Sequence, residues 1–109
     1  MPEPDKIVNF DSVLTIDETK DGCIVEQNAG YQLLGIKQAT LSEGGVVVLV
    51  NQAAFVADLD FLPELQFIEP GPDNPQTIKT QKAAQGWKFL CSGAIYVQGQ
   101  TRNVMVFAK

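Results

Sequence analysis

Histidine is absent from this chain of 109 residues, and its absence excludes several kinds of chemistry. Neither a Ser-His-Asp nor a Cys-His catalytic group can form, and no histidine is available to bind zinc or to shuttle protons. The two cysteines, Cys23 and Cys91, are far apart and form no CxxC pair. Glycine-rich phosphate-binding motifs and the GxSxG nucleophile motif are also missing. We therefore expect no catalytic residue, no metal and no cofactor.

Long apolar runs and a leader sequence are lacking as well. The longest apolar run, Val46–Val50, is much shorter than the roughly 20 residues that a membrane-spanning helix needs. The N-terminal sequence MPEPDKIVNF has no basic region followed by an apolar stretch, so it does not resemble a secretory signal. Two cysteines do not make a disulfide framework. We expect a cytoplasmic protein with two reduced cysteines in or near its core and no contact with a membrane.

Acidic residues are missing from the last third of the chain. All thirteen lie within residues 1–73, against only three lysines, which gives that part a net charge of −10. Residues 74–109 contain four lysines, one arginine and no acid, a net charge of +5. Such asymmetry predicts an anionic partner or self-association through charge-complementary surfaces. General nucleic-acid binding is not favoured, because the sequence pI of about 4.5 makes the overall field repulsive.

The length and composition are those of an ordinary globular protein. With 45% hydrophobic residues, the chain has enough apolar side chains for one core, and folding should bury roughly 65% of the surface that the unfolded chain exposes. No internal repeat, linker or low-complexity segment is visible. We expect a single globular domain over residues 1–109.

Short β-branched runs between turn signals predict an all-β fold, mainly antiparallel. Apolar and polar residues alternate from Val8 to Asp17, Asp21-Gly22 predicts a turn, and Cys23–Gln27 is expected to be the next strand. The run Val46–Val50 is apolar at every position and predicts a central strand that is covered on both faces. In all we expect about seven or eight short strands in a small β-sandwich or a partly open β-barrel.

Two segments near the middle of the chain bear on the fold. Residues Asn51–Leu62 fit either a strand or a helix face, with the strand favoured. After the proline-rich loop Glu69–Pro75, one short helix is predicted near residues 76–85, because Asn74 can cap it and Gly86 can end it.

The last strands predict a hairpin. Residues Ala94–Gln98 and Asn103–Ala108 are expected to pair around a four-residue loop, Gly99–Arg102.

The basic third provides the main candidate binding residues. Cations beside aromatic side chains are typical of proteins that bind single-stranded nucleic acid, because the lysines track phosphates while bases stack on the rings. An OB-like barrel would be a suitable scaffold. The candidate ligand- or partner-binding residues are Lys79, Lys82, Lys88, Arg102, Trp87 and Tyr96.

Three functions follow from these patterns. A small non-catalytic binding or assembly module, homo-oligomeric through complementary charges or bound to another protein, is the first expectation. An OB-like binder of single-stranded nucleic acid or another polyanion is the alternative. The second alternative is a small enzyme or ligand pocket that uses Asp58 and Asp60, since two carboxylates on one strand face could act as acid and base or hold a hard cation.

Overall fold

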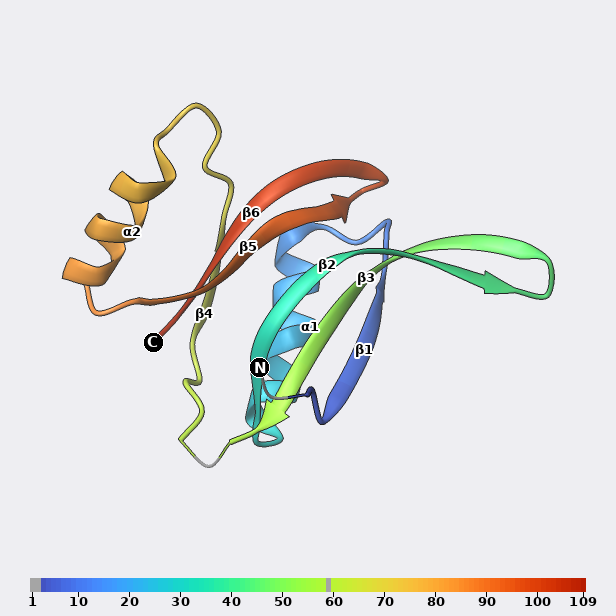
Figure 1. The fold of residues 1–109 in the computed structure, drawn as a ribbon, viewed down its shortest axis with the longest axis horizontal. Helices are drawn as coiled ribbons and strands as arrows, with labels where there is room; N and C mark the ends of the chain where they lie inside the picture. Colours follow the sequence, from blue (N-terminus) through green and yellow to red (C-terminus); the bar gives the residue numbers. More distant parts are fainter. Residues whose placement is uncertain (1–2, 59) are drawn as a thin grey trace.

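A computed structural model describes residues 3–58 and 60–109, and antiparallel strands are its main component (Figure 1). The predicted antiparallel β class is confirmed. Within the described residues there are six strands and two helices, so the expectation of seven or eight strands and one helix was wrong. The elements in chain order are β1 (Lys6–Asp11), α1 (Ile16–Asn28), β2 (Tyr31–Glu43), β3 (Val46–Ala57), β4 (Leu65–Ile68), α2 (Pro75–Ala84), β5 (Lys88–Val97) and β6 (Gln100–Ala108).

Helix α1 replaces the turn and strand that the sequence predicted over residues 18–27. Thr15 caps it: its side chain accepts a hydrogen bond from the backbone N–H of Glu18, whose own side chain accepts one from the Thr15 backbone. Gly22 lies in the middle of the helix because a Cβ there would collide with the ring of Phe10 on β1. The helix therefore packs closely on the sheet, and this contact outweighs the β-like pattern of the sequence.

Helix α2 agrees with the sequence prediction. Asn74 caps it by accepting a hydrogen bond from the backbone N–H of Gln76, Pro75 occupies the first turn, and Gly86 follows its end with a φ of +88°.

The chain forms two three-stranded sheets with the same topology. Sheet A has the order β1-β3-β2 and sheet B the order β4-β6-β5, and in both the two outer strands are antiparallel to the central one. Each sheet is thus made by one β-α-β-β unit. The chain contains an internal structural repeat that was not visible in the sequence.

Local details support this repeat. Each helix is followed by a glycine with positive φ, Gly30 at +94° and Gly86 at +88°. The register of the next strand then shifts three positions beyond each glycine, after Leu33 in β2 and after Phe89 in β5. Leu34 and Leu90 consequently have no opposite residue in the ladder. Gly30 and Leu34 therefore have the same spacing as Gly86 and Leu90.

Alternation along the strands divides the apolar side chains between two cores. The main core lies between the sheets and contains Phe55 from sheet A, Val106 from sheet B and Cys23 from α1, all 0% exposed. Met105 and Phe107 point to the other side of sheet B, where they pack with Ile78 of α2. Helix α1 contacts both β2 and β4, whereas α2 packs on sheet B alone.

A buried asparagine joins the two sheets. Asn51 on β3 is 0% exposed; its amide nitrogen donates to the backbone carbonyl of Tyr96 on β5, and its oxygen accepts from the N–H of the same residue, both at 2.7 Å. The side chain bonds to β5 as a neighbouring strand would. The strand interpretation of Asn51–Leu62 is confirmed as far as Ala57; Leu59 lies outside the described residues.

Both long hairpins end in two-residue turns. Gln98 and Gly99 have φ values of +50° and +77°, so the β5–β6 turn is shorter than the four-residue loop expected from the sequence. The β2–β3 hairpin turns at Gly44-Gly45 and projects from the body of the molecule, on the side opposite α2 (Figure 1). Val46, Val47 and Leu49 are 62%, 64% and 41% exposed there, so the prediction that Val46–Val50 is covered on both faces was wrong; Val50 alone in this run is buried.

Candidate functional site

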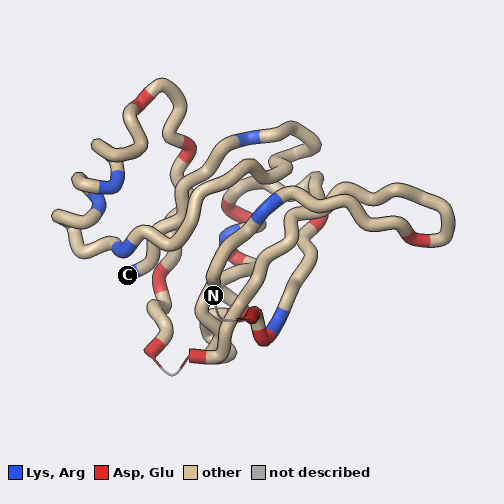
Figure 2. Tube along the Cα trace, in the orientation of Figure 1, with Lys and Arg blue, Asp and Glu red and all other residues tan. Residues whose placement is uncertain are grey.

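The structure brings three of the predicted site lysines together. Lys79 and Lys82 lie on α2, Lys88 begins β5, and the C-terminal Lys109 joins them because β5 and β6 pair at Lys88 and Ala108. In Figure 2 positive residues gather around α2 and the adjoining end of sheet B, and most negative residues lie elsewhere; Glu64, whose backbone pairs with that of Lys109, is an exception. We call Lys79, Lys82, Lys88 and Lys109 the lysine cluster.

Aromatic rings underlie two of these lysines. The Nζ atom of Lys79 is 4.3 Å from the ring centroid of Phe89, and that of Lys109 is 5.6 Å from the centroid of Trp87. Each such contact is worth about 0.5–1 kcal/mol at an exposed site. The rings themselves are half-buried against the α2 core, so their accessible faces are largely occupied by the chain's own cations.

Arg102 and Tyr96 lie apart from the lysine cluster. Both are near the β5–β6 turn, at the other end of these strands, where Tyr96 is opposite Thr101 and Arg102 is opposite Ile95. Arg102 is bound to Glu69, with 3.0 Å between Nη1 and Oε1. The six predicted residues therefore do not form one surface.

Asp58 and Asp60 lie in the loop after β3, not on a strand face. The strand ends at Ala57, and Asp58 Oδ1 accepts a hydrogen bond from the backbone N–H of Asp60 at 2.9 Å. Both residues are exposed. Their geometry is that of a polar turn, and it does not align two carboxylates for acid–base chemistry. In the part of the chain that the structure describes, no group of three Cys, Asp or Glu residues converges to hold a metal ion.

A groove of about 430 Å³ lies on the side of sheet A that faces away from α1. Its floor is the sheet, and one wall is β5, which runs beside β2. Sequence reasoning missed it, because nothing in the pattern of β2 or β5 indicates that these two strands lie side by side. The groove is lined by Pro4, Ile7, Leu34, Gly35, Ile36, Lys37, Gln52, Ala54, Cys91 and Ser92.

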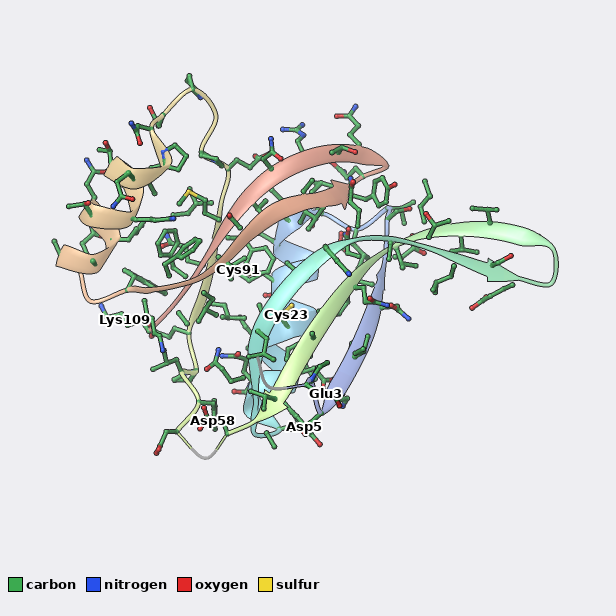
Figure 3. The ribbon with its side chains drawn as sticks, in the orientation of Figure 1. Glu3, Asp5, Cys23, Asp58, Cys91 and Lys109 are labelled. Atoms are coloured by element: carbon green, nitrogen blue, oxygen red, sulfur yellow. The ribbon has the colours of Figure 1, made fainter. Side chains whose placement is uncertain are left out.

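Two free thiols lie near this groove and the main core, Cys91 on β5 and Cys23 on α1 (Figure 3). Burial raises the pKa of Cys23 to about 12. Burial also raises the pKa of Cys91, and a backbone hydrogen bond with Ile36 offsets part of that effect. Neither thiol is ionised near neutral pH, so both act as packing groups and not as nucleophiles.

We expect the free energy of unfolding to fall as the pH rises above 9, because the pKa of these buried thiols is raised in the folded protein. The unfolded Cys23 thiol ionises near its ordinary pKa of 9.0, while the folded one keeps its proton up to a pKa of about 12. The folded state therefore binds the extra proton, and Cys23 should lower the free energy of unfolding by about 1.4 kcal/mol in total between pH 8 and pH 10, most of it above pH 9. Urea unfolding at pH 8, 9 and 10 measures this loss and its slope. Since Tyr and Lys also titrate there, the Cys23→Ala variant is the control; an unchanged slope in that variant would contradict the assignment.

Within residues 3–58 and 60–109, no helix is long and apolar enough to cross a membrane. Comparisons of the chain with models of protein families, with curated proteins and with solved structures found no match.

Proposed function

We propose that this protein is a non-catalytic assembly module whose copies associate through complementary charges. One observation supports this proposal above others: the charge split along the chain persists after folding. The ion pairs among the described residues are Lys6–Glu26, Lys20–Asp17 and Arg102–Glu69, and none of them involves the lysine cluster.

The complementary surface is part of the same chain. Glu3, Asp5 and Asp58 are exposed and lie together at the end of sheet A, away from α2 (Figure 3). Residues 1–57 contain eight acids and three lysines, whereas residues 75–109 contain five cations and no acid. Charges of opposite sign on separate surfaces attract a second copy at long range and orient it. Because the two surfaces differ, such a contact is heterologous and joins copies head to tail.

Light scattering across a salt series tests the proposal. The wild type should exceed the monomer mass of 11.9 kDa at ~50 mM salt and approach it at ~500 mM, because the Debye length falls from about 14 to about 4 Å. Replacing Lys79, Lys82 and Lys88 by Glu should give a monomer at both concentrations. A wild type that is monomeric at ~50 mM salt and high protein concentration would overturn the proposal.

Single variants provide a matched control. Lys82→Glu changes the charge of α2 and should weaken association. Lys20→Glu makes the same change on α1, in a residue that already pairs with Asp17 at 3.7 Å, and should not weaken it. Equal weakening by both would indicate a response to net charge alone.

Polyanion binding is the second candidate, and the gathering of four lysines beside Trp87 favours it. The partial cover of Trp87 by Lys109 and of Phe89 by Lys79 speaks against base stacking, which needs free ring faces. A monomer that is retained on heparin at ~50 mM salt, and released by the triple Glu substitution, would favour this second candidate over self-assembly.

A further inference from the structure

The internal repeat shows which face of sheet A is left open. Ile7 and Ala54 of sheet A are equivalent to Phe67 and Val106 of sheet B. In sheet B this face is covered, because Val106 is 0% exposed and Phe67 packs against the same core. In sheet A, by contrast, Ile7 is 53% exposed. The face of sheet A that points away from α1 is therefore uncovered, and it forms the floor of the groove.

Two positions of this open face are polar where their equivalents are not. Lys37 and Gln52 lie opposite each other on β2 and β3, at the places that Gly93 and Val104 occupy in sheet B. Both side chains line the groove, so it has a polar end with a cation and an amide. The apolar lining is formed by Pro4, Ile7, Leu34, Gly35, Ile36 and Ala54.

Lys37 offers its charge to a ligand. It is exposed, and the ion pairs among the described residues do not include it. None of the described residues that line the groove is acidic, although residues 1–57 contain eight acids. The amide of Gln52 makes a long hydrogen bond to Asn9, at 3.5 Å. A cation and an amide donor at one end of an apolar groove fit an anion with an apolar body.

Close contact between the two sheets holds one wall of the groove in place. Cys91 and Ser92 of β5 line this wall. A Cβ on Gly93 would lie 3.4 Å from the backbone oxygen of Ile36, so β5 approaches β2 here with little room for a side chain. The hydrogen bonds from Asn51 to β5 join the same two sheets. The groove is therefore formed before any ligand binds.

The dimensions of the groove suit a small molecule. Its volume of about 430 Å³ lies within the range of about 300–1,000 Å³ that is usual for small-molecule sites. Lys37 and Leu34 are three positions apart on β2, which is about 10 Å at about 3.3 Å per residue. An alkyl chain advances about 1.3 Å per carbon, given C–C bonds of about 1.5 Å, so about eight carbons span this distance.

We propose that the groove binds an alkyl monocarboxylate of about eight to ten carbons. Its carboxylate accepts hydrogen bonds from Lys37 and Gln52. Its chain lies over Ile7, Gly35 and Ala54. This inference goes beyond the proposed assembly and does not depend on it, because the lysine cluster lies outside the groove.

Titration with decanoate at ~150 mM salt, followed in amide NMR spectra, tests the proposal. The signals of Gly35, Lys37 and Gln52 should shift and saturate. Each methylene added from hexanoate to decanoate should tighten binding by about 2–4-fold, because its burial removes apolar surface from water. Decyltrimethylammonium has the same chain length and the opposite charge, and it should bind at least ~10-fold more weakly than decanoate.

Two variants each remove one feature of the groove. Lys37→Gln removes the charge and should weaken the binding of decanoate by about 10-fold. Gly35→Leu fills the groove and should abolish binding; a Cβ on Gly35 meets no atom within 4 Å, and its φ is not positive, so the strand accepts the side chain. Lys20→Gln is the matched control, because it removes one charge from α1 and should leave the affinity unchanged. Circular dichroism and urea unfolding establish that the variants are folded.

The lysine cluster is the competing anion site. Replacing Lys79, Lys82 and Lys88 by Gln should leave the affinity for decanoate within about 3-fold of that of the wild type, since only long-range charge effects change. If decanoate instead shifts the signals of α2 and this triple variant no longer binds it, the groove proposal is overturned. Unchanged affinity in Lys37→Gln also overturns it, as does the absence of any shift at Gly35 up to ~10 mM decanoate.

Discussion

Replacing Phe55 by Ala should lower the free energy of unfolding by about 3–5 kcal/mol, the usual cost of removing a buried phenylalanine ring. Phe55 is 0% exposed and packs in the main core, which sheet A, sheet B and α1 share. A chain of this length has a total stability of about 5–15 kcal/mol, so the variant should retain only part of it. Equilibrium unfolding in urea, followed by tryptophan fluorescence, measures the loss.

Phe107 is the equivalent position in sheet B and provides the comparison. It is also 0% exposed, and its ring meets that of Phe89 edge to face at 5.5 Å between centroids. Phe107→Ala should therefore lower the free energy of unfolding by a similar amount, because Phe107 packs in the core between α2 and sheet B. Ile7→Ala, at a position that is 53% exposed, should change stability by less than about 1 kcal/mol. A loss below about 1 kcal/mol for Phe55→Ala would show that the shared core is not what holds the two units together.

Asn51→Leu should destabilise the protein by about 2–5 kcal/mol although the substitution adds apolar surface. It leaves the backbone N–H and carbonyl of Tyr96 without partners, and each buried unpaired group costs about 1–3 kcal/mol. Because these bonds join β3 to β5, hydrogen exchange should also accelerate at Tyr96. Urea unfolding and amide exchange measure the two effects.

Gln52→Leu is the control for this prediction. Gln52 is the next residue of β3, points to the opposite face and makes only a weak hydrogen bond with Asn9 at 3.5 Å. Its replacement should change the free energy of unfolding by no more than about 0.5 kcal/mol. Equal losses of stability at positions 51 and 52 would mean that the hydrogen bonds of Asn51 do not hold the two sheets together.

Local signals predicted some elements well and others poorly. Asn74, Pro75 and Gly86 predicted α2 because caps and helix ends act within a few residues. The same kind of signal was present for α1, where Thr15 and Glu18 form a capping box. The alternation of apolar and polar residues from Val8 onward outweighed this signal. A short apolar pattern can fit both the 3.6-residue period of a helix and the two-residue period of a strand.

The candidate site was predictable only in part. Lys79, Lys82 and Lys88 are close in sequence and lie together, whereas Arg102 pairs with Glu69 at the other end of sheet B. Lys109 joins the lysine cluster through strand pairing between residues about twenty positions apart along the chain. The groove is made by β1, β2, β3 and β5, and no local pattern could indicate that combination.

The sequence by itself determined the antiparallel β class, the position of α2 and the segregation of charge, because periodicity, capping residues and residue counts do not depend on how elements are placed in space. Tertiary structure alone decided the repeat of the two β-α-β-β units, the covered and open faces of their sheets, and the absence of a carboxylate partner for the lysine cluster among the described residues. Each of these depends on contacts between segments far apart in the chain, where burial and packing choose among pairings that local preferences leave equivalent. Folding thus left in place the charge split that the sequence displayed, and it placed an open apolar groove on the acidic unit.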